Sequence, residues 1–262
     1  MKVIILASGS KGNATYIETN QTKILIDAGI SHRQVKLRLA RQGIELNHLN
    51  AILITHEHID HTGHLVSLLE KTRAKLYIAK KSLRGIGQRN QPNPYLHDIN
   101  FINPDVKYQI NDLTFVPIAL SHDARNNYGF LLKNKDASLA YITDTGHLPE
   151  KYDAILKQIQ MLIIESNHDV EMLLNSTRTW DLKQRILSNE GHLSNQMCKD
   201  ILNRIVSDQT KIVVLAHVSE ECNTYELAYQ ENYDATVPKG ISLYVAKQHE
   251  ETILFDLEDK VA

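Results

Sequence analysis

Four potential metal ligands lie within six residues of this chain, directly after a short apolar run. The apolar run at residues 50–54 predicts a buried strand, and His56, His58, Asp60 and His61 follow it. In an extended segment His56 and His58 point to the same side, whereas Asp60 and His61 belong to the next turn and can face a second ion. Imidazole and carboxylate ligands suit zinc, and they also suit manganese or iron. Because the chain has only 13 histidines, three in this stretch favour a metal site over a polar surface loop.

Three more potential ligands lie close to the ends of later predicted strands. They are His122 after the strand at 113–119, Asp144 after the strand at 139–142, and His217 after the strand at 211–216. Strand ends are places where polar side chains can converge while the strands themselves stay in the core. These three residues and the first four thus all lie close to the ends of predicted strands.

The pattern His-x-His-x-Asp-His after a strand resembles the metallo-β-lactamase superfamily of metallohydrolases, and the later ligands appear in that superfamily's order. The resemblance implies two divalent ions, Zn²⁺ or Mn²⁺, with a water or hydroxide between them. One ion would be held by His56, His58 and His122, the other by Asp60, His61 and His217, with Asp144 as the bridging ligand. Asp27 lies in the Asp-x-Gly that ends the opening strands. It would orient residues 55–61, called the metal loop below, through a hydrogen bond. The alternative for Asp27 is an ordinary turn residue.

Two further residues match the ribonuclease Z branch of the superfamily. Glu165 follows the predicted strand at 161–164, and His192 precedes a helix that Ser194 is placed to cap. In that branch the equivalent pair assists the leaving group, so the resemblance gives His192, Glu165 and the ligand Asp60 parts in catalysis. The alternative is that His192 only anchors its loop.

Several longer segments resemble the YycJ/WalJ-like group of bacterial metallohydrolases, whose members are regarded as 5′-to-3′ DNA exonucleases. These segments are residues 7–13, 165–169, 191–195 and 215–223. Ser10, Asn13 and His168 lie in them and are predicted to contact substrate. The group usually has Asn at the position of Cys222, which is no ligand position. The large nucleic-acid-clamping insertion of the β-CASP nucleases is missing, because only 72 residues separate Asp144 from His217.

A basic stretch between Lys71 and Arg89 contains seven Lys or Arg residues and no acid. Lys80, Lys81 and Arg84 lie in its second half, in a predicted helix at residues 80–89, and are candidates for contacting phosphates. The alternative is a solvated helix face. The net charge of −2 argues against a global attraction for nucleic acid, so any such contact is local.

Strands occur in two runs interleaved with helices, and predicted strands at 241–245 and 252–257 close the second half. This order predicts an α/β fold of the metallo-β-lactamase type, an αββα sandwich with two mixed β-sheets flanked by helices and the site at one edge. We expect one domain over residues 1–262. No apolar run is long enough to span a membrane, no segment matches a secretion signal, and the two cysteines lack a C-x-x-C partner. We therefore expect a cytoplasmic protein.

These features favour a phosphodiesterase, specifically a DNA exonuclease acting through a metal-bridging hydroxide. The alternatives are an RNA-processing nuclease, a cyclic phosphodiesterase, and a thioesterase or lactamase using the same centre on a carbonyl. A non-catalytic metal-binding regulator is disfavoured by the complete ligand set. The basic stretch and the Glu165–His192 pair favour phosphate, with DNA as the expected nucleic-acid partner.

Overall fold

The structure, a computed structural model, describes residues 1–258, and these divide into two compact units. Unit 1 comprises residues 1–119, 124–137 and 248–258, and unit 2 comprises residues 120–123 and 138–247. Both units contain buried strands. The single domain expected over residues 1–262 stays a prediction.

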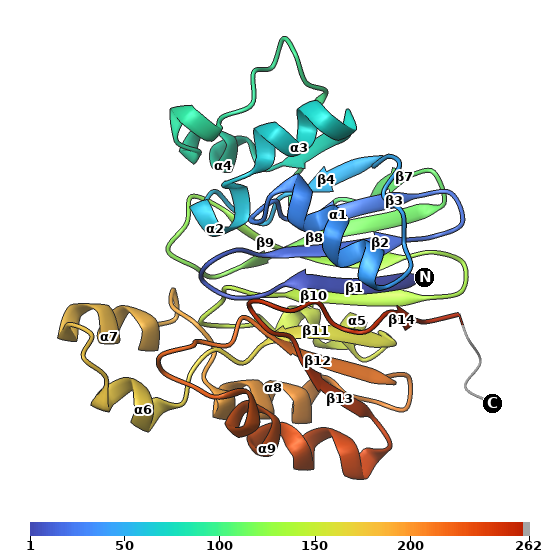
Figure 1. Cartoon of the computed structure of the whole chain (residues 1–262). Coiled ribbons are helices and arrows are strands. Elements are labelled where there is room, and N and C mark those ends of the chain that lie inside the picture. The colour runs from blue at the N-terminus through green and yellow to red at the C-terminus, as the bar shows by residue number, and fades with distance from the viewer. Residues whose placement is uncertain (259–262) are drawn as a thin grey trace. The chain divides into compact units, whose positions relative to one another are not determined.

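Unit 1 contains a mixed sheet of seven strands among the described residues, in the order β14-β1-β2-β3-β4-β5-β6 (Figure 1). Strands β14, β1, β2 and β3 are antiparallel neighbours, and β3 to β6 are parallel. The strand bounds are β1 Lys2–Ala7, β2 Ala14–Glu18, β3 Lys23–Ile26, β4 Ala51–Leu53, β5 Lys75–Ile78, β6 Ile99–Phe101 and β14 Phe255–Asp256.

Helices connect the parallel strands of this sheet, because parallel neighbours need a crossover. Their bounds are α1 His32–Arg41, α2 Ile59–Thr62, α3 Leu65–Thr72 and α4 Lys80–Gly85. Ser31 caps α1 by accepting a hydrogen bond from Gln34 N. The apolar faces of α1 and α3 pack on the sheet, where Val35, Leu39 and Leu68 join a buried cluster with residues of β1 to β5. This packing holds β4, and with it the start of the metal loop, in the core.

Helix α4 is shorter than the predicted helix at 80–89. It ends at Gly85, Ile86 is extended, and a separate 3₁₀ turn follows at Gln88–Asn90. Glycine is a poor helix former, and Gly85 and Gly87 flank the break. Lys80, Lys81 and Arg84 nevertheless all lie on α4 and are exposed.

Unit 1 also contains β7 Tyr108–Ile110, β9 Asn127–Lys133 and most of β8 Leu113–Leu120, with β7 and β8 antiparallel. The turn between β7 and β8 is hydrogen-bonded to the turn between β2 and β3. Asp112 Oδ1 accepts hydrogen bonds from Thr19 Oγ1 and Thr22 Oγ1, both at 2.6 Å, and Asp112 Oδ2 accepts one from Gln21 N at 3.3 Å.

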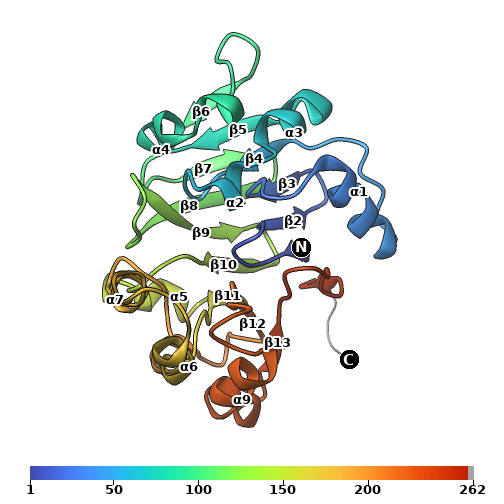
Figure 2. The same ribbon diagram turned by 60° about the vertical axis from the view of Figure 1, so that its left-hand side comes forward.

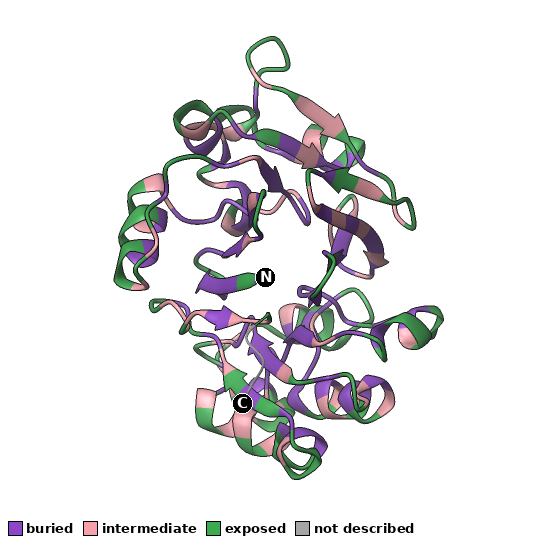
Figure 3. Ribbon diagram, turned by 90° about the vertical axis from the view of Figure 1, so that its right-hand side faces the viewer, coloured by how far each residue is buried: buried purple, intermediate pink, exposed green. Residues whose placement is uncertain are grey.

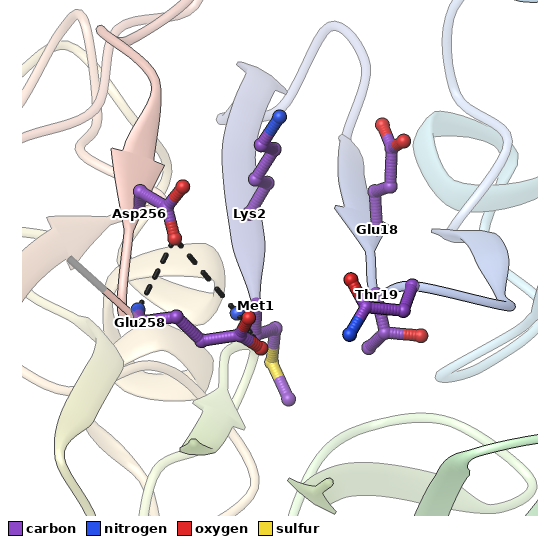
Figure 4. Close-up of a pocket in the computed structure, with 7 residues that line it drawn as sticks. Met1, Lys2, Glu18, Thr19, Asp256 and Glu258 are labelled. Carbon is purple, nitrogen blue, oxygen red and sulfur yellow. Dashed lines mark hydrogen bonds and ion pairs between the residues drawn. The ribbon is translucent and has the colours of Figure 1, made fainter. Parts of the chain in front are cut away.

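The predicted strand at 252–257 is wrong in both length and partner. Only Phe255–Asp256 is a strand, and it pairs with β1 in unit 1 instead of closing the second half. Thr252 N and Leu257 N donate to Ile5 O and Met1 O, so the segment covers the free edge of β1. Figure 4 shows the small polar pocket beside this edge, where Asp256 Oδ1 accepts from Glu258 N and lies 3.9 Å from the Met1 nitrogen.

Unit 2 contains a parallel sheet in the order β13-β12-β11-β10. The strands are β10 Ser138–Ile142, β11 Met161–Glu165, β12 Ile212–Ala216 and β13 Ser242–Val245. The helices are α5 Asp153–Leu156, α6 Val170–Asn175, α7 Trp180–Leu187, α8 Asn195–Ile205 and α9 Tyr225–Thr236 (Figure 1). Ser194 caps α8 by accepting from Met197 N, as predicted. Strands β10 and β11 are buried throughout, whereas β13 contains two exposed residues. Figure 3 shows helices that alternate between buried and exposed residues.

Within the described chain, no helix is both long and apolar enough to cross a membrane.

Candidate metal centre

The metal loop of unit 1 runs from the end of β4 into α2. The rings of His56 and His58 meet edge to face with centroids 4.5 Å apart, and the rings of His56 and His61 lie 4.1 Å apart. Asp60 Oδ2 lies 3.2 Å from His61 Nε2. Four of the predicted ligands are therefore gathered within unit 1, and His56 and His61 are fully buried.

Asp27, just after β3, lies beneath this loop. Its Oδ2 is 2.8 Å from His61 Nδ1, and its Oδ1 accepts from Thr55 N at 2.9 Å. Burial raises the pKa of the Asp27 carboxyl, while the His61 imidazole and the Thr55 hydrogen bonds oppose that shift. A carboxylate on Nδ1 fixes the ring of a metal-binding histidine and leaves Nε2 for the ion.

Asn13, predicted to contact substrate, is buried against the same loop. Its Nδ2 donates to Asp60 Oδ2 at 3.1 Å and lies 3.0 Å from His61 Nε2, and its backbone N donates to Asp60 O at 2.8 Å. Asn13 therefore helps to position Asp60. The predicted contact between Asn13 and substrate stays a prediction. Ser10 is exposed in the same turn.

Unit 2 gathers a second cluster, in which Asp144, Glu165, His192 and His217 each offer an atom within 4.8 Å of the others. Glu165 Oε1 lies 2.8 Å from His192 Nδ1 and 2.9 Å from His217 Nδ1. Asp144 Oδ1 is 3.3 Å from His217 Nδ1 and 4.0 Å from His192 Nδ1. Glu165 therefore contacts both the predicted acid and a predicted ligand, whereas the sequence had paired it with His192 alone.

Backbone donors complete the environment of Glu165. Its Oε2 accepts from Thr145 N at 2.8 Å and from Leu193 N at 3.3 Å. Burial alone would raise the pKa of the Glu165 carboxyl, but the His192 and His217 imidazoles outweigh it and lower that pKa. Glu165 is thus held as a carboxylate that can orient both rings.

His122 lies at the edge of this second cluster. Its ring centroid is 5.0 Å from that of His192, its Nδ1 is 3.1 Å from Gly191 O, and its Nε2 is 3.2 Å from Asp123 Oδ1. Burial lowers the pKa of His122, and the neighbouring Asp144 opposes that shift. The neutral imidazole is the form that binds a metal ion.

His168 is buried in unit 2, after β11. Neither ring nitrogen has a hydrogen-bond partner among the described residues, and burial lowers its pKa to about 4. Its predicted contact with substrate is untested.

Two features of the structure around the predicted ligands could not be predicted from the sequence: three backbone angles and a network of buried amides. Asp27, Asp144 and His217 all have positive φ values, 64°, 55° and 53°, so each turns sharply at or just after a strand end. Such angles are uncommon for residues other than glycine and concentrate at functional sites. A buried amide network also supports the loops of unit 2: Asn223 Nδ2 donates to Asn195 Oδ1 at 2.8 Å and to Asn167 O at 3.1 Å.

The residues present fit divalent metal ions. His61 in unit 1 and His217 in unit 2 each present Nδ1 to a buried carboxylate, Asp27 and Glu165 respectively. The remaining donors are imidazole nitrogens and carboxylate oxygens, a set that suits zinc or manganese. Each cluster thus contains donor types that suit a metal ion and one histidine whose ring is oriented by a buried carboxylate.

A sequence model described as the beta-lactamase superfamily domain matches residues 22–218. The chain is 33% identical over 239 residues to a protein of Bacillus anthracis named exodeoxyribonuclease YycJ, covering 91% of this chain and 90% of that protein. It is 35% identical over 233 residues to exodeoxyribonuclease WalJ of Streptococcus pneumoniae, covering 87% of this chain and 85% of that protein.

Solved structures share the fold at low sequence identity. The metallo-β-lactamase-fold protein YhfI of Bacillus subtilis aligns with a TM-score of 0.70 at 13% identity, covering 96% of this chain and 98% of that one. Human tRNase Z, short form, aligns with a TM-score of 0.59 at 16% identity over 96% of this chain and 98% of that one. The predicted fold class, two mixed sheets flanked by helices, is confirmed. The chain belongs to the beta-lactamase superfamily, with YycJ and WalJ among its relatives, and is a metal-dependent hydrolase.

Proposed function

We propose that the protein is a dinuclear metal-dependent phosphodiesterase that degrades DNA as an exonuclease, from the 5′ end toward the 3′ end. Two relatives that cover most of the chain bear the name exodeoxyribonuclease, which supports DNA as the substrate. A nucleic-acid substrate is also consistent with the exposed basic side chains of α4.

The proposed ligand assignment follows the order of ligands in the family. His56, His58 and His122 hold one ion, Asp60, His61 and His217 hold the other, and Asp144 bridges them. When bound, two such ions, Zn²⁺ or Mn²⁺, supply a nucleophile near neutral pH and neutralise charge on the phosphate. Asp27 and Asn13 keep His61 and Asp60 in place through the hydrogen bonds described above.

The observation that carries the proposal is the contact between His192 and the buried Glu165 carboxylate, 2.8 Å long, beside Asp144. A histidine in this position can donate a proton to the leaving oxygen of a phosphodiester, and a carboxylate on Nδ1 orients the ring and stabilises its protonated form. A 3′- or 5′-hydroxyl of DNA is a poor leaving group and needs that proton. A thioester makes no such demand on an acid, because its thiolate leaves readily without a proton.

The proposal is tested with purified protein, Mn²⁺ or Zn²⁺, and 5′- or 3′-labelled single- and double-stranded DNA and RNA. We expect mononucleotide release from the 5′ end of DNA, slower reaction with RNA, and no cutting of circular single strands. Nitrocefin, a thioester and a cyclic nucleotide are run in parallel. If one of these compounds is hydrolysed efficiently while DNA is not cleaved, the protein is a small-molecule hydrolase instead. If RNA is cleaved in preference to DNA, the protein is an RNA-processing nuclease.

A further inference from the structure

An exposed basic surface lies on unit 1 beyond the metal loop. Lys80, Lys81 and Arg84 project from α4, and Arg89 follows in the 3₁₀ turn. Within the described part of the chain, none of these four side chains forms an ion pair. The Lys80 ammonium instead lies 5.8 Å from the centre of the Phe101 ring on β6. These cations are therefore available to an anionic partner.

Exposed apolar side chains accompany the cations. Tyr95 is 94% exposed and its neighbour Leu96 is 74% exposed, in the loop that follows the 3₁₀ turn, and Phe101 is 47% exposed. The loop has a defined turn, because Asn93 Oδ1 accepts from Tyr95 N at 2.9 Å and Asn93 O accepts from Leu96 N at 3.0 Å. Figure 2 shows this loop extending beyond α4 and β6. Exposed apolar side chains on the same part of the chain as exposed cations indicate a binding surface.

Arg125 connects this surface to the metal loop. Its backbone N donates at 2.6 Å to Oε1 of Glu57, the residue between His56 and His58. A Cβ atom placed on Gly85, at the end of α4, would lie 2.7 Å from Glu57 Cγ and 2.9 Å from Arg125 Cδ. The side chains of Glu57 and Arg125 therefore lie directly against the end of α4. The Arg125 side chain is exposed, so the basic surface extends up to the metal loop.

We propose that single-stranded nucleic acid binds along this surface, with Arg125 contacting the backbone nearest the metal loop and Tyr95 stacking on a base farther along. The inference rests on the proposed function and identifies the form of its substrate. Cations at intervals match backbone phosphates, and an aromatic side chain offers its face to any base. The bases of a duplex are already stacked on each other, so an exposed tyrosine favours an unpaired strand. Asp98, at the end of the loop that carries Tyr95, lies 3.6 Å from Lys75 Nζ and is thereby partly neutralised.

The test measures binding of the metal-loaded protein to phosphorothioate oligonucleotides, which resist hydrolysis. Tyr95→Ala should weaken binding of a single strand by roughly 5- to 150-fold, the equivalent of one lost base stack, and Tyr95→Phe should restore it. An oligonucleotide with abasic sites should bind wild type more weakly than one with all its bases. Its affinities for wild type and for Tyr95→Ala should be equal, because it has no base for Tyr95 to stack on. The matched control is Tyr233→Ala on α9, since Tyr233 is 41% exposed and lies in unit 2.

Arg125→Ala should lower affinity and reduce the slope of log K against log salt by about 0.7, the value for one phosphate contact with a single strand. Lys135→Ala, which removes an exposed cation of unit 1 away from α4, should leave the slope unchanged. Unchanged binding in both Tyr95→Ala and Arg125→Ala would overturn the inference, as would equal losses for single strands and duplexes. If wild type is a dimer and Tyr95→Ala is a monomer, the surface binds a second copy of the chain instead of nucleic acid.

The two proposals fail in different ways. If the protein cleaves DNA but the Tyr95 and Arg125 variants bind and cleave it like wild type, the proposed function stands and this inference fails. If the protein cleaves no nucleic acid yet binds single strands with the stated dependence on Tyr95 and Arg125, the binding surface stands and the proposed function fails.

Discussion

Asp144 is the residue on which the proposed ligand assignment depends most, because it is the one carboxylate assigned to both ions. We expect Asp144→Ala to lose at least one metal ion and hydrolytic activity while the fold is retained. Since Asp144 has a φ of 55°, alanine adds backbone strain, whereas Asn tolerates this angle. Asp144→Asn is therefore the matched variant that removes the charge alone. Metal analysis with circular dichroism checks both, and full metal content in either variant would contradict the assignment.

His192 and Glu165 separate acid catalysis from metal binding. His192→Ala should lower turnover of DNA by roughly 10² to 10⁴ while both ions stay bound, and it should affect bis(p-nitrophenyl) phosphate less, because p-nitrophenolate leaves readily without a proton. Glu165 also holds His217, so Glu165→Gln should lose metal as well as activity. Equal losses by His192→Ala on both substrates would argue against acid catalysis.

At the scale of elements, Gly29 permits the turn after β3 to approach α2. A Cβ atom at residue 29 would lie 1.7 Å from Asp60 O and 2.4 Å from Asn13 N, both backbone atoms. We expect Gly29→Ala to lower the free energy of unfolding by about 3 kcal/mol or more and to weaken metal binding by shifting Asp60. Gly87→Ala, where nothing lies within 4 Å of the added atom, should change neither quantity. Denaturant unfolding and metal titration of the two variants decide the point.

Asp112 fastens two turns of unit 1, and its contribution should depend on pH. Burial works to raise the pKa of Asp112, but hydrogen bonds from Thr19 and Thr22 outweigh it, so the pKa is lowered. A carboxyl whose pKa is lower in the folded chain than in the unfolded chain stabilises the fold. This contribution is fully present above the unfolded pKa of about 3.9 and is lost as the pH falls through the lower folded pKa. We expect Asp112→Asn to cost about 1 kcal/mol at pH 7, a low figure because the side chain is partly exposed.

The measurement for Asp112 is urea unfolding of wild type and Asp112→Asn at pH 7 and pH 3. The difference between the two proteins should be smaller at pH 3 than at pH 7, because below about 3.9 the unfolded chain takes up a proton that the lowered pKa makes the folded chain bind less readily. The exposed Asp136 has no side-chain hydrogen bond among the described contacts, so Asp136→Asn should match wild type at both pH values. A constant difference for Asp112→Asn across the range would show that the hydrogen bonds do not depend on its charge.

At the scale of the whole molecule, metal binding should stabilise the fold. A ligand that binds only the folded chain at 100 times its Kd contributes about 2.7 kcal/mol. For a chain of this size, removal of the ions by a chelator should therefore lower Tm by roughly 5–10 °C, and added Zn²⁺ or Mn²⁺ should restore it. Calorimetry with and without chelator measures the change. A protein that purifies with bound metal and yet shows the same Tm after complete chelation would contradict this expectation.

Local sequence patterns were enough to predict most of the strands, the start of α8 and the residue types of both clusters, but not β6 or the bounds of β14. Apolar runs and polar strand ends are local patterns, and the spacing of His56, His58, Asp60 and His61 is set by a few bonds. Ser194 and Ser31 likewise act on amides only three residues away. The match to family order then extended the prediction to Asp144 and His217.

The contacts between distant segments are visible only in the folded chain. The pairing of β14 with β1, the sharing of Glu165 between His192 and His217, and the approach of Arg125 to Gly85 each join residues at least 27 positions apart. No local pattern specifies such partners, because they depend on how the sheets and their crossovers pack. The positive φ values of Asp27, Asp144 and His217 belong here too, since the surrounding structure must hold a backbone conformation that these residues do not favour alone.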